Sequence, residues 1–208
     1  MRPKNADSEE TWNQIVDAAR RELVSDQHGG ASLSLRKVAS AADVSLGTIH
    51  YYFPEKEALL EACLDAYYSA LAALTTELAD ALNRADRGNA RATLAESVRR
   101  IYRFAVSEQP RLKLRAATNA ARGHLHPQRD AHVRGPYLQW LAPVVQRIAD
   151  VDLMTTRMAI QTMSFAVMHY ALLSDAELTQ IVGVGGAAGL QKVEDHLVHV
   201  ALGLIFAR

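Results

Sequence analysis

The segment SLGTIHYYF, residues 45–53, carries the side chains whose types and spacing point most directly to a chemistry. If the segment is helical, His50, Tyr51 and Tyr52 point in three directions and cannot all be buried together. At least one of them must therefore face water or a partner. Imidazole and phenol groups hydrogen-bond phosphate oxygens and base edges, so this segment has the chemistry needed to bind nucleic acid.

The residues around this segment have the spacing of a helix-turn-helix. Such a motif needs a small residue where its two helices cross, a turn residue that tolerates positive φ and a branched apolar residue in the second helix. Ala39, Asp43 and Ile49 occupy those positions. Aspartate replaces the more usual glycine, and it can adopt the left-handed conformation at some cost. We therefore expect a helix-turn-helix here.

A second helix that buries Ile49 and Phe53, four residues apart, exposes the rest of its surface. There, Gly47 allows a sugar-phosphate backbone to approach closely, and His50 can reach a base edge. Ordinary tyrosine packing with exposed hydroxyl tips is the alternative explanation of the aromatic run. The candidate DNA-binding residues are Arg36, Lys37, Ser45, Leu46, Gly47, Thr48, His50, Tyr51, Tyr52 and Lys56.

Charge is unevenly distributed along the chain, although the net charge is zero. Residues 1–65 contain 7 basic and 11 acidic residues, whereas residues 84–157 contain 14 basic and 6 acidic ones. Nucleic-acid binding by the first segment would therefore depend on a local cationic patch. In the second segment we expect a solvated basic face. Arg111 and Arg115 share one helix face, which could hold an anion if it turned inward.

The periodicity of apolar residues predicts an all-α protein with about nine helices. Asp7 is the expected cap of the first helix, and Pro143 is expected to interrupt or kink a later one. Residues 153–173 are apolar nearly all round and should be buried on more than one side, whereas residues 183–189 should form a flexible turn. The expected helices cover residues 8–25, 34–42, 46–53, 55–84, 89–107, 110–122, 137–150, 153–173 and 191–206.

Composition argues against several classes of protein. The single cysteine, Cys63, rules out an internal disulfide and fits a reducing compartment. The sequence has no run of about 18 to 20 consecutive apolar residues, the length that spans a membrane. Its first residues lack the apolar segment of a signal peptide. We expect a cytoplasmic protein without a membrane partner.

Two regions with different tasks are expected, a three-helix DNA-binding head over residues 1–65 and a helical bundle for ligand binding and dimerisation over residues 66–208. A two-turn recognition helix reads only a few base pairs, so pairing of two chains would supply the missing specificity. The last two long helices, residues 153–173 and 193–205, carry more apolar surface than one small bundle needs. A four-helix interface in a homodimer would use it. The alternative is that both helices lie inside a monomer core.

Candidate ligand-binding side chains lie in the second region, where they could form a mostly apolar pocket with a few polar groups. Plain core packing is the alternative for the apolar members, and a satisfied core histidine is the alternative for His169. The candidates are Tyr102, Phe104, Arg115, Asn119, Trp140, Met163, Phe165 and His169.

The sequence offers little support for catalysis, a metal or a cofactor. Residues 183–188 fit G-x-G-x-x-A, but the segment before them is helical in composition, and a dinucleotide fingerprint needs a strand there. His124, His126 and His132 lie in a polar connection without the spacing of a metal site. No nucleophile–base–acid set is discernible. The alternatives to a DNA-binding regulator are a helical interaction or small-molecule-binding module without DNA affinity and a small helical enzyme.

Residues 34–62, SLRKVASAADVSLGTIHYYFPEKEALLEA, resemble the DNA-binding segment of tetracycline-repressor (TetR) family transcriptional regulators. The usual form is close to Val-Ser-x-Gly-Thr-x-Tyr-x-Tyr-Phe-x-x-Lys-Glu-x-Leu, so His50 replaces a tyrosine, and Asp43 replaces the turn glycine. The resemblance covers about residues 8–65. It implies a homodimer whose heads bind a palindromic operator, and a small effector in the C-terminal bundle that releases the DNA. The matching residues are Val44, Ser45, Gly47, Thr48, Tyr52, Phe53, Lys56, Glu57 and Leu59.

Overall fold

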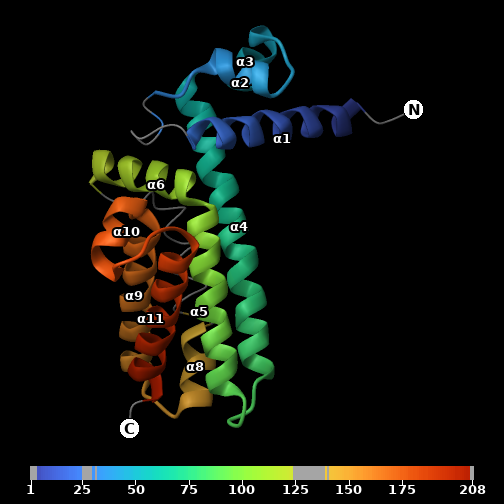
Figure 1. Ribbon diagram of the computed structural model, residues 1–208. Helices are drawn as coiled ribbons and strands as arrows, with labels where there is room; N and C mark the ends of the chain where they lie inside the picture. Colours follow the sequence, from blue (N-terminus) through green and yellow to red (C-terminus); the bar gives the residue numbers. More distant parts are fainter. Residues whose placement is uncertain (1–3, 25–29, 31, 124–138, 140, 207–208) are drawn as a thin grey trace. The chain divides into compact units, whose positions relative to one another are not determined.

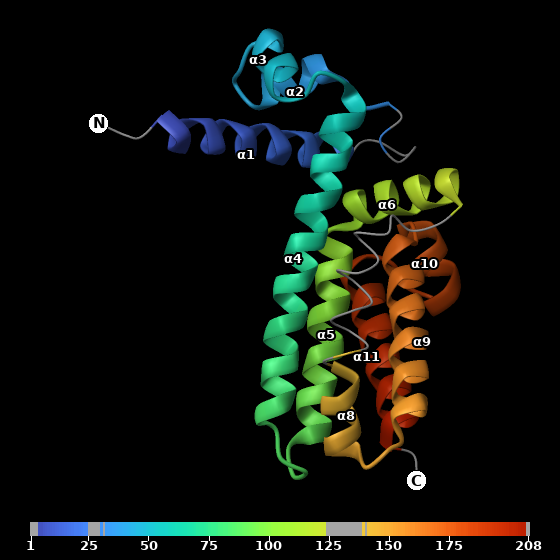
Figure 2. The ribbon, with the colours of Figure 1, turned by 180° about the vertical axis from the view of Figure 1, so that it is seen from behind.

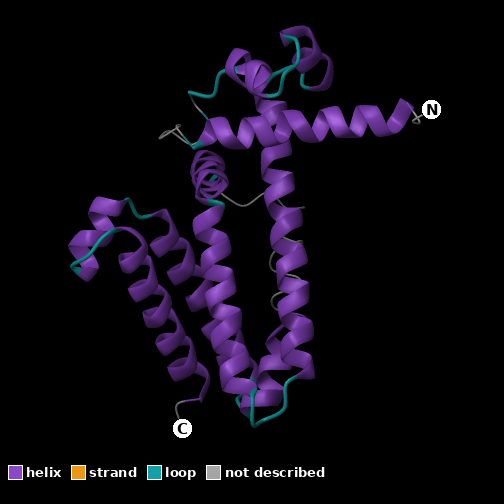
Figure 3. Cartoon of the chain, turned by 45° about the vertical axis from the view of Figure 1, so that its right-hand side comes forward, coloured by secondary structure: helices purple, strands orange, loops and turns teal. Residues whose placement is uncertain are grey.

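The computed structural model describes residues 4–24, 30, 32–123, 139 and 141–206, and every regular element in this part of the chain is helical (Figure 3). The all-α prediction is confirmed, and the ten described α-helices are close to the expected number. Their bounds are α1 Lys4–Leu23, α2 Leu35–Ala41, α3 Leu46–Tyr52, α4 Lys56–Arg84, α5 Ala90–Ser107, α6 Gln109–Arg122, α8 Ala142–Ala149, α9 Leu153–Leu172, α10 Asp175–Val182 and α11 Gly186–Phe206.

Contacts divide the described residues into two compact units. The first, here called the head, comprises the described residues from 4 to 69 and from 109 to 123, and therefore holds α1, α2, α3, the first half of α4 and all of α6 (Figure 1). The second, here called the bundle, comprises the described residues from 70 to 108 and from 139 to 206. Helix α6 thus belongs to the same unit as the helix-turn-helix, although α5 separates the two in the sequence.

The apolar stripe of α1 forms one side of the core of the head. Ile15, Ala18 and Ala19 are fully buried and Leu23 nearly so, as their helical spacing predicts. The helix begins at Lys4, so Asp7 lies within it, and the expected cap at Asp7 is wrong. The described part of the chain thus extends the first helix by one turn beyond the sequence prediction.

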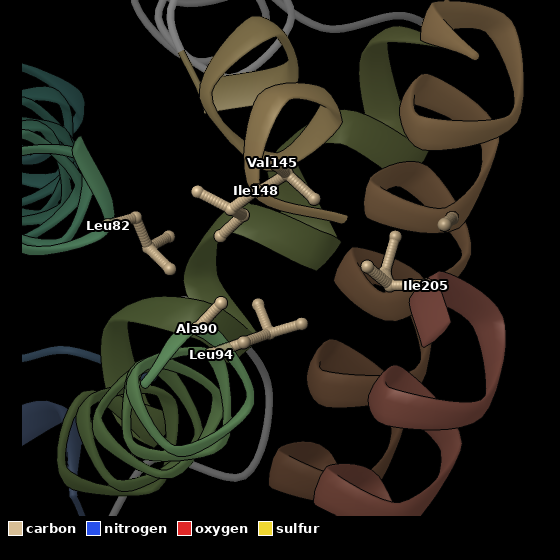
Figure 4. Packing of buried hydrophobic residues seen from close by; sticks show 7 residues of the cluster. Leu82, Ala90, Leu94, Val145, Ile148 and Ile205 are labelled. Atoms are coloured by element: carbon tan, nitrogen blue, oxygen red, sulfur yellow. The ribbon is translucent and has the colours of Figure 1, made fainter. Parts of the chain in front are cut away.

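In the bundle, α5, α9 and α11 run alongside one another, with α8 next to α5 and α9 (Figure 1, Figure 2). Pro143 lies in the first turn of α8, where its missing N–H costs no hydrogen bond. The expected interruption near Pro143 is therefore present, as the point at which α8 begins. Aliphatic side chains from several helices meet in one core cluster (Figure 4), formed by Leu82, Ala90, Leu94, Val145, Ile148, Ala159 and Ile205.

In the single chain, one side of α9 is exposed, because Met154, Met158 and Phe165 are 67%, 62% and 59% exposed. The expectation of a flexible turn over residues 183–189 is wrong in part. Helix α11 starts at Gly186, so residues 186–189 are helical and not part of a flexible turn. The carboxylate of Asp175 accepts a hydrogen bond from the backbone N–H of Gly186 and so satisfies a donor at the start of this helix. None of the described helices has the length and hydropathy needed to cross a membrane.

Candidate nucleic-acid interface

Helix α3 begins and ends where local sequence signals predict. Ser45 has an extended backbone, and its hydroxyl accepts a hydrogen bond from the N–H of Thr48 at 2.9 Å, which caps the helix. Ile49 and Phe53 are buried, at 0% and 3% exposure, as expected from their separation of one turn. The ring of Phe53 lies 6.0 Å from that of Trp12 in α1, measured between centroids. These contacts fix which side of α3 faces outward.

The turn between α2 and α3 has the geometry of a helix-turn-helix. Asp43 has φ 53°, so this aspartate adopts the left-handed conformation that its position requires. The N–H of Val44 donates to the carbonyl of Ala39 at 3.0 Å and closes the turn. Val38 and Ala39 are buried where α2 packs against its neighbours. The helix-turn-helix prediction is confirmed.

The outward side of α3 consists of four residues spaced one turn apart in two pairs. Leu46 and His50 form one pair, and Gly47 and Tyr51 form the other. Gly47 and His50 are exposed, Leu46 is half-buried, and Tyr51 is 80% exposed. A phenol ring left this far in water costs hydrophobic free energy, so the side chain is not explained by core packing.

Tyr52 packs against α1, whereas Tyr51 does not. The hydroxyl of Tyr52 donates to Oγ of Ser8 at 3.2 Å, and the ring of Tyr52 meets that of Tyr51 edge to face, with centroids 5.1 Å apart. With Ser8, Glu9 and Trp12 it lines a shallow hollow on the surface of the head. The ring of Tyr52 therefore helps to join α3 to α1, and its hydroxyl already has a protein partner.

The other candidate DNA-binding side chains surround α3. The hydroxyls of Ser45 and Thr48 lie 2.8 Å apart and share one hydrogen bond, which leaves one hydroxyl proton of the pair for a phosphate oxygen. Arg36 and Lys37 are exposed in the first turn of α2. Lys56 is half-buried at the first residue of α4.

The candidate ligand-binding residues are distributed over both units. Arg115 and Asn119 are half-buried on α6 in the head, where the guanidinium of Arg115 lies 5.7 Å from the ring centre of Tyr68. The candidates in the bundle lie on α5 and α9, and Trp140 lies outside the described residues. His169 is exposed, so it is not the buried imidazole that the apolar sequence of α9 suggests. Phe104 and Met163 are half-buried and Phe165 is largely exposed, but Tyr102 is buried.

Tyr102 combines deep burial with an unsatisfied polar group. Its side chain is 1% exposed, and its hydroxyl has no hydrogen-bond partner among the described residues. Burial, followed by the nearby carboxylate of Glu194 and the phenol of Tyr170, raises the pKa of Tyr102 to about 12. The hydroxyl is therefore protonated at neutral pH and can donate a hydrogen bond.

Several basic residues of α5 and α6 are buried or form ion pairs, whereas a solvated face would need neither. Arg111 is 6% exposed and approaches the carboxylate of Asp17 at 3.9 Å, so the expectation of a solvated position is wrong there. Arg103 donates two hydrogen bonds of 2.8 Å to the buried carboxylate of Glu194, which Arg99 approaches at 3.3 Å. Sequence reasoning did not single out Glu194. The sequence feature that could have indicated Glu194 is the pair Arg99 and Arg103, which lie one turn apart on the helix that faces it.

The described residues contain no arrangement that favours catalysis. Burial raises the pKa of the Cys63 thiol to about 12, so the reactive thiolate is strongly disfavoured. Within the described ranges, no three histidine, cysteine or acidic side chains are placed to hold a metal ion. The histidines at positions 124, 126 and 132 lie outside those ranges.

Comparison with known proteins places the helix-turn-helix in a sequence family. Residues 15–63 match the model of the tetR family of bacterial regulatory proteins. Over 82 residues, the chain is 35% identical to the HTH-type transcriptional regulator BetI of Burkholderia mallei and of Burkholderia pseudomallei. That match covers 39% of this chain and only 41% of the length of those relatives.

Similarity of fold extends over nearly the whole chain. A TetR-family regulator from Mesorhizobium loti superimposes with a TM-score of 0.68 at 17% identity, over 98% of this chain and 97% of the other. The multidrug binding protein EbrR, solved with malachite green, superimposes with a TM-score of 0.59 at 21% identity, over 93% and 97% of the two chains. At these identities the likeness establishes the fold and leaves ligands open.

Proposed function

Because residues 15–63 match the tetR family of bacterial regulatory proteins, we propose that the chain is a DNA-binding transcriptional regulator of this family. In this proposal it represses transcription as a homodimer on a palindromic operator, and a small-molecule effector releases it. Residues 1–65 bind DNA, and residues 66–208 bind the effector and dimerise. Catalysis plays no part.

Gly47 carries the DNA-binding part of the proposal. A methyl group at this position would meet only Oγ of Ser45, at an ordinary contact distance of 3.5 Å. Glycine destabilises a helix by up to about 1 kcal/mol relative to alanine, so neither space nor local stability favours it here. Close approach of an external backbone explains it, because a sugar-phosphate chain could lie against the helix between His50 and Tyr51.

The charges near α3 fit the same surface. Arg36 and Lys37 are exposed on α2, which packs against α3, and they supply a local cationic patch within the acidic segment of residues 1–65. The hydroxyl of Tyr51 and the one remaining hydroxyl proton of the Ser45–Thr48 pair add neutral phosphate contacts. The remaining candidate, Lys56, stands at the start of α4, where exposed backbone N–H groups also favour phosphate.

The substitution Gly47→Ala tests this assignment. We expect unfolding stability to stay equal or to rise by up to about 1 kcal/mol, because alanine is the better helix former. Affinity for the DNA upstream of the chain's own coding sequence should nevertheless fall by about tenfold or more, since a methyl group separates helix and backbone. Fluorescence anisotropy measures the binding, and urea unfolding measures the stability.

Lys37→Ala provides the matched comparison. It should weaken binding to all DNA sequences alike. The slope of log affinity against log salt concentration should become shallower by about one, as expected when one phosphate contact is lost. If Gly47→Ala binds DNA as tightly as the natural chain, the outward side of α3 is not the reading surface.

Tyr102 supports an effector site in the bundle. A buried hydroxyl without a partner costs about 1–3 kcal/mol, and a ligand that accepts its hydrogen bond would remove that cost. Phe104 and Met163 are half-buried on α5 and α9, the helices that also carry Tyr102 and Tyr170. EbrR, which has the same fold, binds the small organic molecule malachite green in its solved structure. Arg115, Asn119, Trp140, Phe165 and His169 stay in the proposal as weaker effector contacts.

The exposed side of α9 supports the homodimer. Met154, Met158 and Phe165 project within a narrow sector of the helix, since they are separated by four and seven residues. Leu204 on the neighbouring α11 is 40% exposed. Large apolar side chains exposed along one sector of a helix favour an interaction site, and pairing of α9 and α11 with their copies would bury them.

A further inference from the structure

His50 lies on the outward side of α3. It follows Leu46 by one turn and lies between Leu46 and Gly47 around the helix, since successive residues are rotated by about 100°. It is exposed, as is Gly47, whose missing side chain clears the space beside it. A ligand that lies along this side of the helix therefore meets the imidazole of His50.

One nitrogen of this imidazole is already committed within the protein. Nδ1 of His50 lies 3.4 Å from the carbonyl oxygen of Pro54 in the geometry of a hydrogen bond. A carbonyl oxygen can only accept, so this contact is a hydrogen bond when Nδ1 carries the proton and donates it. In an uncharged imidazole the second nitrogen, Nε2, then has no proton and can only accept a hydrogen bond.

We propose that His50 reads the operator as a hydrogen-bond acceptor through Nε2, and so prefers a base that presents an amino group, adenine or cytosine, at the position that it contacts. In the major groove those groups are N6 of adenine and N4 of cytosine, whereas N7 and O6 of guanine are acceptors and would face Nε2 unfavourably. The inference rests on the proposed DNA-binding function and adds a base preference to it.

The other side chains on this surface are less selective. Tyr51 has a hydroxyl, which both donates and accepts, and Leu46 has no polar group. Tyrosine, which the TetR form has at the position of His50, likewise offers a hydroxyl. Replacement by a histidine with one committed nitrogen therefore turns a permissive contact into one of fixed polarity.

The first test needs no DNA. The ring ¹⁵N chemical shifts of full-length, ¹⁵N-histidine-labelled protein report which nitrogen carries the proton, at about pH 8, where histidine side chains are ordinarily uncharged. The signals of His50 are assigned as those lost in His50→Ala. We expect the Nδ1–H tautomer. Predominance of the Nε2–H tautomer in the free protein would overturn the inference.

The second test measures the base contact. Full-length protein selects sites from a pool of duplexes randomised over about two helical turns, which is the span of two half-sites. Each selected adenine or cytosine is then replaced by its analogue without the amino group. At one position in each half-site, this replacement should lower the affinity of the natural protein about three- to tenfold, which corresponds to the free energy of one hydrogen bond.

Variants at position 50 separate this contact from general weakening. His50→Ala should bind DNA less tightly, but removal of the amino group at that base position should not lower its affinity further. Removal of an amino group at other positions should lower the affinity of both proteins equally. His50→Gln, whose amide oxygen accepts, should regain the sensitivity. Coupling of His50 to a guanine, or to no base, overturns this inference alone. If no sequence is retained from the pool, the proposed function fails together with it.

Discussion

Asp43 holds the turn between α2 and α3 in a conformation that costs an L-amino acid about 1–2 kcal/mol, less for aspartate than for most residues. We predict that Asp43→Gly raises the stability of the head by up to about 1 kcal/mol and leaves DNA binding intact. Asp43→Ala should lower the stability instead. Urea unfolding distinguishes the two variants.

Asp150 gives a matched control in the bundle, because it caps α8 with nearly the same backbone conformation, φ 55°. Asp150→Gly should bring a gain of similar size without touching the candidate interface. A loss of stability in Asp43→Gly would mean that the carboxylate makes a contribution that its conformation does not explain.

The hydroxyl of Tyr102 gives a second prediction at the residue scale. Tyr102→Phe keeps the buried ring and removes a polar group without a partner in the described structure, so stability in urea should not fall. A loss of more than about 1 kcal/mol would show that the hydroxyl already has a partner, and would remove the main support for an effector there.

The same variant should change the response to alkali. The pKa of Tyr102 is raised from 10.0 to about 12, so the folded state resists an ionisation that the unfolded state undergoes near pH 10. The unfolded state then binds fewer protons, and stability falls as the pH rises from 10 to 12. Tyr102→Phe should lose less stability over this interval than the natural chain.

At the scale of elements, the connection from α10 to α11 depends on glycine. A Cβ at Gly189 would lie 2.5 Å from the carbonyl oxygen of Val184 and 2.9 Å from the side chain of Leu178. Since a backbone atom cannot yield as a flexible side chain can, Gly189→Ala should destabilise the bundle by about 1–3 kcal/mol. Thermal and urea unfolding measure this loss.

Gly203 is the matched position in the same helix, because a Cβ there meets nothing within 4 Å. Gly203→Ala should stabilise the chain by up to about 1 kcal/mol through helix propensity alone. Equal responses of the two variants would contradict the close packing seen at Gly189.

At the scale of the whole molecule, the exposed side of α9 predicts an association of two chains. Phe165→Glu places a charge in the proposed apolar interface and should raise the dissociation constant of the dimer by about tenfold or more. DNA affinity should fall with it, because one head reads too few base pairs. Analytical ultracentrifugation over a range of concentrations measures the dissociation.

Ala117→Glu on α6 serves as the control, since it adds the same charge at an exposed helical position in the other unit, on a helix that is not part of the proposed interface. It should leave the oligomeric state unchanged. A dimer of undiminished strength in Phe165→Glu would place the interface elsewhere and leave the exposed methionines of α9 unexplained.

The sequence alone determined the elements whose causes are local. Ser45 caps α3, Ile49 and Phe53 bury one side of it, and Asp43 takes the left-handed turn, as the residue types within a few positions of one another predict. Helical periodicity likewise predicted an all-α chain and most helix bounds. The predicted starts of α1 and α11 were wrong. Asp7 has the residue type of a cap but lies inside a longer α1, and the start of α11 is capped by Asp175 from the preceding helix, α10.

Only the tertiary structure decided what depends on distant residues. The burial of Arg111, the joining of α6 to the head, and the engagement of Glu194 by two arginines follow from which helices pack together. Periodicity records that α9 is apolar, but not which neighbours cover it, and so it could not reveal the exposed side of that helix. Tyr52 and Tyr102 differ for the same reason. Ser8 lies within reach of the hydroxyl of Tyr52, whereas helix packing buries Tyr102 without placing a described partner beside its hydroxyl.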